Sequence, residues 1–497
     1  MTVKIKYLLL LVVLVVLLLP YLTRVPTPYI DEMWHIDTGW NFVNSGNLAP
    51  TPFGNIAGIN RISFQPPVFN ILMGWWLGLF GLGMFQARLL VVVMAALILL
   101  LTYLIGKILY DEKTAMVSAT LVFFWCYIVF RYVRYDIAVA LFFLIGFYLF
   151  LLAEKGEHKA VLCLLSGLSC GLASISHLYG GIGALAILVL FFIKHRFKLF
   201  SRREVWFFIL GLAVPLAVYA AYMYPYRELI AKQLQLFAPG RYSLLSPAFY
   251  MRNIATEVQR WSHPFSLAFV CSVLFFFWVY RKELKAHLKV LAVILTFLVF
   301  FTLFVQVKTF VYALVVCPFI AICVSVVWLN IWQRLTNKLR FPSRASQCIL
   351  VILLLLLVAV RPVRVLWKVW YKYGVGKSNY TTYLEEISRY IPENSIVLSQ
   401  YGYWLGFTNN TFYSEFLVTI MKNNYGIDFS QAVKALGVEY LVIDETFLHY
   451  QQDPDIPSFL EKECLLVGSV TNELYSNFPG YGTEHDGVTR IYSVKQR

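Results

Sequence analysis

The chain has 497 residues, of which 59% are hydrophobic and only 14% are charged. Soluble globular proteins carry about 25% charged residues, so this composition excludes an ordinary soluble protein and indicates that most of the chain is embedded in lipid. The formal net charge of +15 is typical of basic cytoplasmic loops in a multispan protein. No basic run has the interleaved aromatic residues of a nucleic-acid surface, so nucleic acid is not an expected partner.

Apolar stretches of the ~17–25 residues needed to cross a hydrocarbon core recur between residues 7 and 362. They predict an α-helical polytopic membrane protein with about 11 transmembrane helices, 12 or 13 being the alternatives. The first run follows two lysines, as a signal peptide would, but no small-residue cleavage site comes after it, which favours an uncleaved span. The expected spans are 7–22, 87–106, 114–131, 136–153, 160–177, 178–193, 205–224, 263–280, 287–307, 310–330 and 345–362.

Charge sets the expected orientation, because short loops rich in Lys and Arg stay on the cytoplasmic side. The strongest such loops are 194–203, 280–289 and 334–344. These loops and the N-terminus can all be cytoplasmic only if 66–106 crosses the membrane once. The apolar run 66–82 is therefore expected to be an interfacial or re-entrant helix, which suits its Pro-Pro start and its two Trp residues. The alternative is that 66–82 spans and the N-terminus lies outside.

This orientation makes the chain a multi-pass cell-membrane protein with a cytoplasmic N-terminus and polar segments gathered on the outer side. Residues 1–362 form the transmembrane domain, with outer loops at 23–86 and 225–262. Past residue 363 polar residues and turn formers appear, and helix–turn–strand patterns predict a small extracytoplasmic α/β domain over 363–497. Strands are expected in the stretches ENSIVLSQ, VEYLVID, ECLLVGSV and RIYSVK.

The stretch PYIDEMWHIDTGW (28–40) places carboxylates directly after the first span. A helix is expected from Asp31 to about Ser45-Gly46, lying on the outer membrane surface within the first outer loop. Its apolar residues recur on one face, at Met33, Ile36, Trp40 and Val43. Asp31 could be only an N-cap or a functional carboxylate, and the periodicity alone leaves both readings open.

Other polar residues fall at the outer ends of spans. Arg131, Arg134 and Asp136 lie in the turn RYVRYD, where Arg131 could instead reach the lipid headgroups. His177 lies at a tight turn between two spans, and Lys308, with Tyr312 four residues later, lies at a short outer turn against the positive-inside trend. Loop 225–262 adds further cations, which could equally be attracted to anionic lipid; they include Arg227, Lys232, Arg241, Arg252, Arg260 and His263.

The expected outer face of the membrane protein combines carboxylates with an excess of basic residues, and this combination indicates a class of reaction. Cations suit the phosphate of a lipid carrier, and a carboxylate suits a general base that removes a proton from a nucleophile. The combination indicates transfer of a group from a lipid phosphate to an acceptor. Two other classes remain: a transporter or flippase, which would place charges at mid-bilayer within inverted repeats, and a non-catalytic scaffold.

The ordered motifs of the first ~330 residues resemble the GT-C glycosyltransferases, in the branch of the protein O-mannosyltransferases and lipid A aminoarabinose transferases. That family has an Asp-Glu pair after the first span, a Ser-Gly-(Asp/Asn) turn, a Pro-Pro dipeptide, an Ala-Arg step, an Arg-x-Asp turn, a Gly-Leu-Ala segment before Thr-Lys-Gly, and a Lys-x-x-x-Tyr step. This chain has Asp31-Glu32, Ser45-Gly46-Asn47, Pro66-Pro67, Ala87-Arg88, Arg134-Tyr135-Asp136, Gly171-Leu172-Ala173 with Ser176-His177, and Lys308 with Tyr312. It departs from the family at Gln65 and His177, where a cationic residue is common.

The resemblance implies an inverting hexosyl- or pentosyltransferase that uses an undecaprenyl- or dolichyl-phosphate sugar on the outer face, with a lipid, glycan or protein as acceptor. Asp31 would be the catalytic base, and Arg134 and Lys308, with His177, would neutralise the departing phosphate. Glu32 and Asp136 would orient the sugar or hold the neighbours of Asp31. No metal or cofactor requirement is predicted, and Glu32 and His177 could hold a divalent cation. The full set of expected substrate-binding residues is Glu32, Gln65, Arg131, Arg134, Asp136, His177, Arg241, Lys308 and Tyr312.

Overall fold

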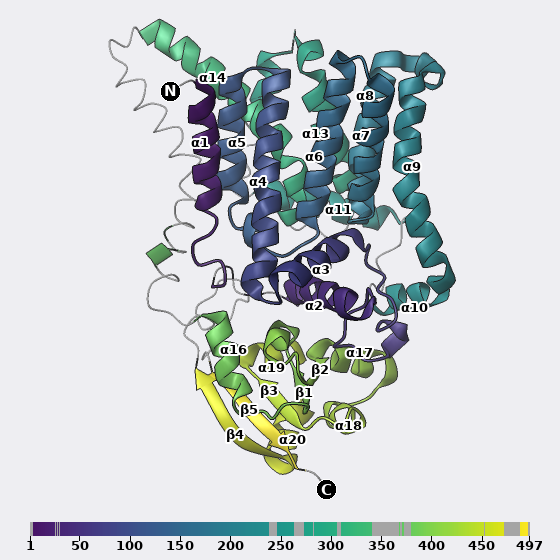
Figure 1. Cartoon of the computed structure of the whole chain (residues 1–497), viewed down its shortest axis with the longest axis vertical. Helices are drawn as coiled ribbons and strands as arrows, with labels where there is room; N and C mark the ends of the chain where they lie inside the picture. Colours follow the sequence, from purple (N-terminus) through teal and green to yellow (C-terminus); the bar gives the residue numbers. More distant parts are fainter. Residues whose placement is uncertain are drawn as a thin grey trace.

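The computed structural model describes residues 3–24, 26, 28, 30–237, 246–262, 273–281, 283–305, 310–339, 367, 370–371, 379–451, 453–471 and 488–495. A bundle of apolar helices forms one part of the molecule, and a small domain built on a β-sheet caps one end of it (Figure 1). The N-terminal end of α1 lies at the opposite end of the bundle (Figure 1). Which membrane face each end occupies stays a prediction, because no membrane is present.

The bundle helices follow the predicted apolar runs. They are α1 (Val3–Val16), α4 (Met84–Leu109), α5 (Glu112–Cys126), α6 (Asp136–Lys155), α7 (Lys159–Ser174), α8 (Gly181–His195), α9 (Arg203–Met223), α13 (Leu284–Phe304) and α14 (Cys317–Leu339). Within the described part of the chain, five helical stretches are long and apolar enough to cross a membrane. Most of the predicted span 263–280 and all of 345–362 lie outside the described residues, so the total of 11 stays a prediction.

Small residues let bundle helices pack closely, as is common between membrane helices. At the crossing of α7 and α9, a Cβ added to Gly167 would lie 2.0 Å from the Phe208 carbonyl oxygen. A Cβ added to Gly211 would lie equally close, 2.0 Å, to the Leu164 carbonyl oxygen. Any larger residue at either position would therefore push the two helices apart.

Two helices of the first outer loop, α2 (Ile30–Ser45) and α3 (Val68–Phe80), lie between the bundle and the sheet domain (Figure 1). With 13 residues, α3 is shorter than the ~20 residues that span a bilayer, and it lies across the bundle axis, as expected of an interfacial helix. α2 ends where predicted, at Gly46, whose φ of +75° favours glycine.

The second outer loop also folds into helices, α10 (Arg227–Phe237) and α11 (Pro247–Ser262). Gln233 of α10 is buried and fastens this loop to the first one. Its Nε2 donates to the Ile62 carbonyl over 2.9 Å, and its Oε1 accepts from the Phe64 N–H over 2.9 Å. The two outer loops therefore form one layer at this end of the bundle.

The sheet domain has five strands in the order β2-β1-β3-β5-β4. The strands β2, β1 and β3 are parallel, whereas β5 pairs antiparallel with β3 and β4. Four strands were predicted: β1 (Ile396–Ser399), β3 (Tyr440–Ile443), β4 (Cys464–Thr471) and β5 (Val488–Val494). The strand β2 (Thr411–Ser414) was not predicted, since its sequence TFYS is less apolar than IVLS of β1 and YLVI of β3.

The helices of this domain are α16 (Tyr380–Ser388), α17 (Glu415–Tyr425), α18 (Phe429–Ala435), α19 (Glu445–Gln451) and α20 (Asp455–Glu463). A 3₁₀ segment, η8 (Tyr401–Gly406), follows β1 at the carboxyl edge of the parallel strands. η8 packs directly against α2. The sheet domain is therefore in contact with the helix that begins with the Asp-Glu pair.

Candidate active site

The site is built around Arg134, which bridges two carboxylates from distant parts of the chain. Its guanidinium pairs with Asp31 at the start of α2, and its Nε donates to Asp136 Oδ2 over 2.8 Å at the start of α6. Asp31 is the second residue of α2 rather than its N-cap. The predicted convergence of Asp31, Arg134 and Asp136 is therefore present in the structure.

Asp31 is the carboxylate of this group that a substrate can reach. Its side chain is 43% exposed, against 10% for Arg134 and 1% for Asp136. The surrounding protein still limits its hydration, and this desolvation raises the pKa of Asp31 above its ordinary value. Arg134 opposes that shift, while the negative charges of Asp136 and Glu32 add to it. A carboxylate with a raised pKa is a better proton acceptor.

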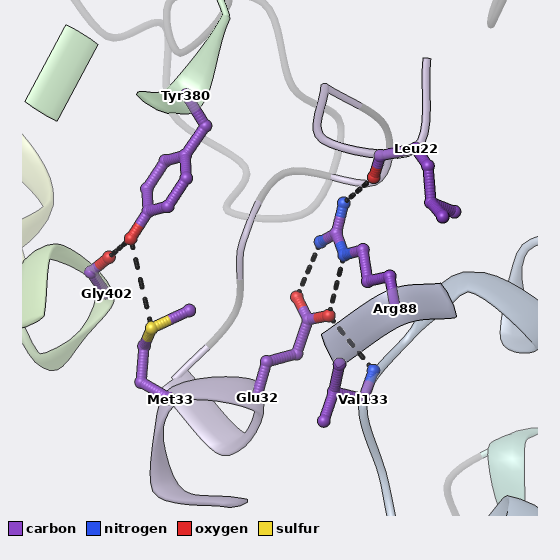
Figure 2. Close-up of polar contacts among 7 residues, drawn as sticks. All are labelled: Leu22, Glu32, Met33, Arg88, Val133, Tyr380 and Gly402. Atoms are coloured by element: carbon purple, nitrogen blue, oxygen red, sulfur yellow. Dashed lines mark hydrogen bonds and ion pairs between the residues drawn. The ribbon is translucent and has the colours of Figure 1, made fainter. Parts of the chain in front are cut away.

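Glu32, the neighbour of Asp31, has a structural role in this arrangement. Arg88 binds both of its carboxylate oxygens, with Nε–Oε1 at 2.9 Å and Nη2–Oε2 at 2.7 Å, and neither side chain has exposed surface (Figure 2). The Val133 N–H also donates to Glu32 Oε1 over 3.0 Å, and Arg88 Nη1 donates to the Leu22 carbonyl over 2.7 Å. These contacts fit the expected alternative that Glu32 holds the neighbours of Asp31, and in this conformation both of its oxygens are bound by protein rather than turned to a sugar or a divalent cation.

Arg131 is also structural. It has no exposed surface, and its guanidinium donates to the carbonyls of Leu18, over 3.1 Å, and Pro20, over 2.7 Å. It therefore fastens the chain after α1 to the turn before α6. Its guanidinium is directed at these protein carbonyls, not towards the expected substrate or lipid headgroups. Together with Glu32 and Arg88 it fixes the segment that leads into Asp31.

Aromatic rings surround the other side of the site. The His177 ring stacks on Tyr135 with centroids 4.3 Å apart, and the Tyr312 and Tyr135 hydroxyls lie 3.4 Å apart. The Tyr179 hydroxyl donates to Asp136 Oδ1 over 2.6 Å, so both oxygens of Asp136 are bound by protein. Asp136 thus holds Arg134, the partner of Asp31, which is one of its two expected roles, and His177 and Tyr312 lie near the charged cluster.

His177 contributes no positive charge in this state. Burial lowers its pKa to about 4, and its Nδ1 accepts the Tyr179 N–H over 3.4 Å. The ring is therefore neutral near pH 7, with its proton on Nε2. A phosphate placed beside it would favour the charged form, because an opposite charge raises the pKa of an imidazole.

Gln65 lies just before α3, whose first N–H, that of Val68, donates to the Ile175 carbonyl over 3.4 Å. This contact brings the Gln65 segment beside the His177 turn. The side-chain oxygen of Gln65 is buried and has no hydrogen-bond partner within the described structure. It is thus available to a hydroxyl or amine donor once one enters. Arg241 and Lys308 lie outside the described residues.

His35 was missed by the sequence analysis. It lies one turn after Asp31 on α2, and its Nδ1 is 2.7 Å from Asn70 Oδ1 of α3. Burial lowers its pKa to about 4, so the ring is neutral, and it lies edge-on to Tyr135 at 5.3 Å. The spacing of four residues from Asp31 places it on the same helix face, and this signal was present in the sequence.

The described part of the chain contains no group of three or more His, Cys, Asp or Glu residues suited to hold an ion. Glu32 is occupied by Arg88, and the His177 ring lies between the rings of Tyr135 and Tyr312. The proposed pairing of Glu32 with His177 around a divalent cation is not formed here.

Part of the chain matches a known protein family, and the fold resembles solved structures. Residues 64–224 match the model of the family described as dolichyl-phosphate-mannose-protein mannosyltransferase. No curated protein sequence matches the chain. The fold resembles ArnT from Cupriavidus metallidurans, solved bound to undecaprenyl phosphate, with a TM-score of 0.62, 12% identity, and coverage of 99% of this chain and 98% of that one.

A second similar structure is the oligosaccharyltransferase AglB from Archaeoglobus fulgidus, in complex with an inhibitory peptide and a dolichol-phosphate. Its TM-score is 0.54 at 14% identity, with coverage of 89% of this chain and 69% of that one. At such identities the likeness concerns the fold. The fold similarity and the family match over 64–224 together confirm the predicted resemblance to the GT-C glycosyltransferases.

Proposed function

We propose that this chain, which resembles the GT-C glycosyltransferases, is an inverting transferase that moves a sugar from a polyprenyl-phosphate carrier to an acceptor at the membrane surface. The observation that carries the proposal is the pairing of a half-exposed carboxylate, Asp31, with a nearly buried guanidinium, Arg134. The fold and the family match support the reaction class. The carrier is an undecaprenyl or dolichyl phosphate, the sugar a hexose or pentose, and the acceptor a lipid, glycan or protein.

In the proposed reaction Asp31 accepts the proton of an acceptor hydroxyl or amine. The acceptor atom then bonds to the anomeric carbon on the face opposite the phosphate, and the carbon–oxygen bond to the phosphate breaks. The carrier phosphate leaves with the electron pair, so the configuration inverts. Phosphate is a good leaving group and needs no strong general acid; its charge is stabilised by Arg134 and, by sequence, Lys308.

An apolar cavity beside the His177 turn supports a lipid-borne donor. It has a volume of about 320 Å³ and lies between α9 and the segment from the end of α7 to α8. A chain of isoprene units there would exchange lipid contacts for apolar side chains while its phosphate reached the charged cluster. The lining residues are Ser174, Ile175, Leu178, Gly181, Ala184, Leu185, Leu188, Leu212, Leu216 and Tyr219.

Transport is the alternative function, and no described feature favours it. A transporter would hold its charges at the bilayer midplane. The charged cluster of this chain lies instead at the start of α2 and α6, next to the sheet domain.

The test is sugar transfer from a defined polyprenyl-phosphate donor by the full chain in membranes. A general base contributes about 10²–10⁴-fold, so Asp31→Asn should lower the rate by that factor. Asp111→Asn is the matched control, because Asp111 caps α5 through the Thr114 N–H and its amide can do the same. Equal rates for the wild type and Asp31→Asn would remove Asp31 from the mechanism, and no transfer by the wild type would refute the function.

A further inference from the structure

The sheet domain is joined to α2 by a buried hydrogen bond between side chains 364 residues apart. The Tyr401 hydroxyl donates to Asp37 Oδ2 over 2.8 Å, and neither side chain has exposed surface. Asp37 follows Asp31 by six residues on α2, which is less than two helical turns. The bond therefore links η8 of the sheet domain to the helix that carries the proposed base.

Asp37 accepts further hydrogen bonds besides that from Tyr401. The N–H and the hydroxyl of Thr51 donate to its two oxygens over 2.7 and 2.8 Å, and no basic side chain of the described residues pairs with it. A buried carboxylate without a cation depends on its hydrogen bonds, because leaving it unsatisfied is costly. The next residue, Pro52, accepts the Ser414 N–H of the sheet domain over 3.0 Å. The Thr51 loop thus lies between α2 and the sheet.

Tyr401 is itself held firmly within the sheet domain. It begins η8, directly after β1, and its backbone N–H donates to Glu415 Oε2 over 2.8 Å. Its ring packs against Phe53 at 5.6 Å and against Trp34 of α2 at 6.3 Å. Because its backbone is bound within the sheet domain and its hydroxyl is bound to Asp37, Tyr401 fixes the position of Asp37 relative to the sheet domain.

A second contact lies nearer to Asp31. Tyr380, at the start of α16, points its hydroxyl at the Met33 sulfur over 3.9 Å and also donates it to the Gly402 carbonyl (Figure 2). Met33 is two residues after Asp31 and fully buried. The first turns of α2 are thus held by Arg88 of the bundle through Glu32, and by the sheet domain through Met33 and Asp37.

We propose that the sheet domain positions α2 for catalysis, with Tyr401 as the positioning residue that acts on Asp31 through its hydrogen bond to Asp37. The catalytic part of this inference rests on the proposed function. α2 has 16 residues and lies across the end of the bundle, so the bundle alone leaves one of its sides uncovered. A displacement of about 1 Å in a reacting group can cost ~10²-fold in rate.

The experiment compares Tyr401→Phe with Tyr403→Phe in the full chain in membranes or nanodiscs. Tyr403 lies in the same 3₁₀ segment, but its hydroxyl bonds to Asp444 within the sheet domain, at 2.6 Å. Hydrogen exchange of the α2 amides is measured first, then kcat and KM for transfer. We expect Tyr401→Phe to speed α2 exchange at least threefold and to lower kcat about tenfold with KM for the donor within twofold. Tyr403→Phe should leave α2 exchange and kcat within twofold of the wild type.

Asp37→Asn provides a second variant, which keeps an acceptor oxygen but weakens the bond, because hydrogen bonds to neutral groups are weaker. Like Tyr401→Phe, it should speed α2 hydrogen exchange and lower kcat, each by a smaller factor. The double variant should lose less than the product of the two single losses, since both changes weaken the Tyr401–Asp37 bond and only Asp37→Asn also weakens the bonds from Thr51. Additive losses, unchanged α2 exchange in Tyr401→Phe, or faster exchange with unchanged kcat would overturn the proposal. An inactive wild type would refute the proposed function, while hydrogen exchange would still decide whether Tyr401 holds α2.

Discussion

Two acidic clusters at opposite ends of the helical bundle differ in how many basic partners each carboxylate has. At the end opposite the sheet domain, Glu154 has two lysine partners, Lys194 at 2.9 Å and Lys289 at 2.5 Å. At the sheet-domain end a single guanidinium, that of Arg134, forms ion pairs with two carboxylates, Asp31 and Asp136. A carboxylate with surplus cations stays charged and inert, whereas one that shares a single cation under desolvation can take up a proton. The comparison distinguishes charges that stabilise the fold from a charge that is available for chemistry.

The largest effect on stability should come from the buried pair Glu32–Arg88. Breaking a buried ion pair by removing one partner costs about 3–5 kcal/mol, so Arg88→Met should lower the unfolding free energy by that amount. The exposed pair Lys107–Glu112, at 3.1 Å, is the control, because exposed pairs contribute about 0–1 kcal/mol. Thermal unfolding in detergent of Arg88→Met and Lys107→Met measures the difference. Equal losses would show that Glu32–Arg88 does not hold the approach to Asp31.

The largest effect on activity besides that of Asp31 should come from Arg134. Removing one group that stabilises developing charge costs ~10²–10³-fold in kcat, and we expect this loss for Arg134→Gln in the transfer assay. Lys194→Gln, at the other end of the bundle, should stay within twofold of the wild type. If Arg134→Gln also stays within threefold, the departing phosphate is neutralised by other residues and the contrast between the two ends fails.

The smallest expected effect is a pH dependence of stability from two buried carboxyls near the domain contact. Burial raises the pKa of Asp37 from 3.8 and that of Glu415 from 4.5, each to about 7. Between about pH 4 and 7 these two groups hold protons in the folded state that they have released in the unfolded chain, so their contribution to stability is greatest below pH 4 and falls as the pH rises towards 7. The slope is at most about 1.4 kcal/mol per pH unit for each group.

Thermal unfolding measured at half-unit pH steps tests this slope. Asp37→Asn should remove the contribution of Asp37 to the slope of stability against pH. A wild-type stability that rises between pH 4 and 7 would not by itself decide the matter, because other groups titrate there. An unchanged slope in Asp37→Asn would contradict the pKa shift of Asp37.

How far the sequence predicts the site depends on which helix face a residue occupies. Asp31, Arg134 and Asp136 were found because each lies where a span begins or ends, and span ends on one side of a membrane converge. Glu32 has the same signal but turns inward, because consecutive helix residues point about 100° apart. Arg131, at the end of the 3₁₀ segment Val129–Arg131, also has the signal and is buried. Without the direction of α2, its two acidic neighbours could not be told apart.

For the fold as well, local sequence patterns predict some features, whereas contacts between distant residues are not predicted. Apolar length predicted the bundle helices, and strand patterns predicted four of the five strands. The contact of Tyr401 with Asp37 joins residues 364 positions apart, and no local pattern in a single sequence reports it. His35 could have been found from its four-residue spacing to Asp31, whereas its partner Asn70 could not.

The most direct test of Asp31 as the base is the pH profile of kcat/KM for transfer, which reports the free enzyme. We predict an acid limb at a pH above the ordinary range of an aspartate, because desolvation raises the pKa of Asp31. That limb should be absent from the residual activity of Asp31→Asn. An acid limb that persists unchanged in Asp31→Asn would show that another group takes the proton and would contradict the mechanism.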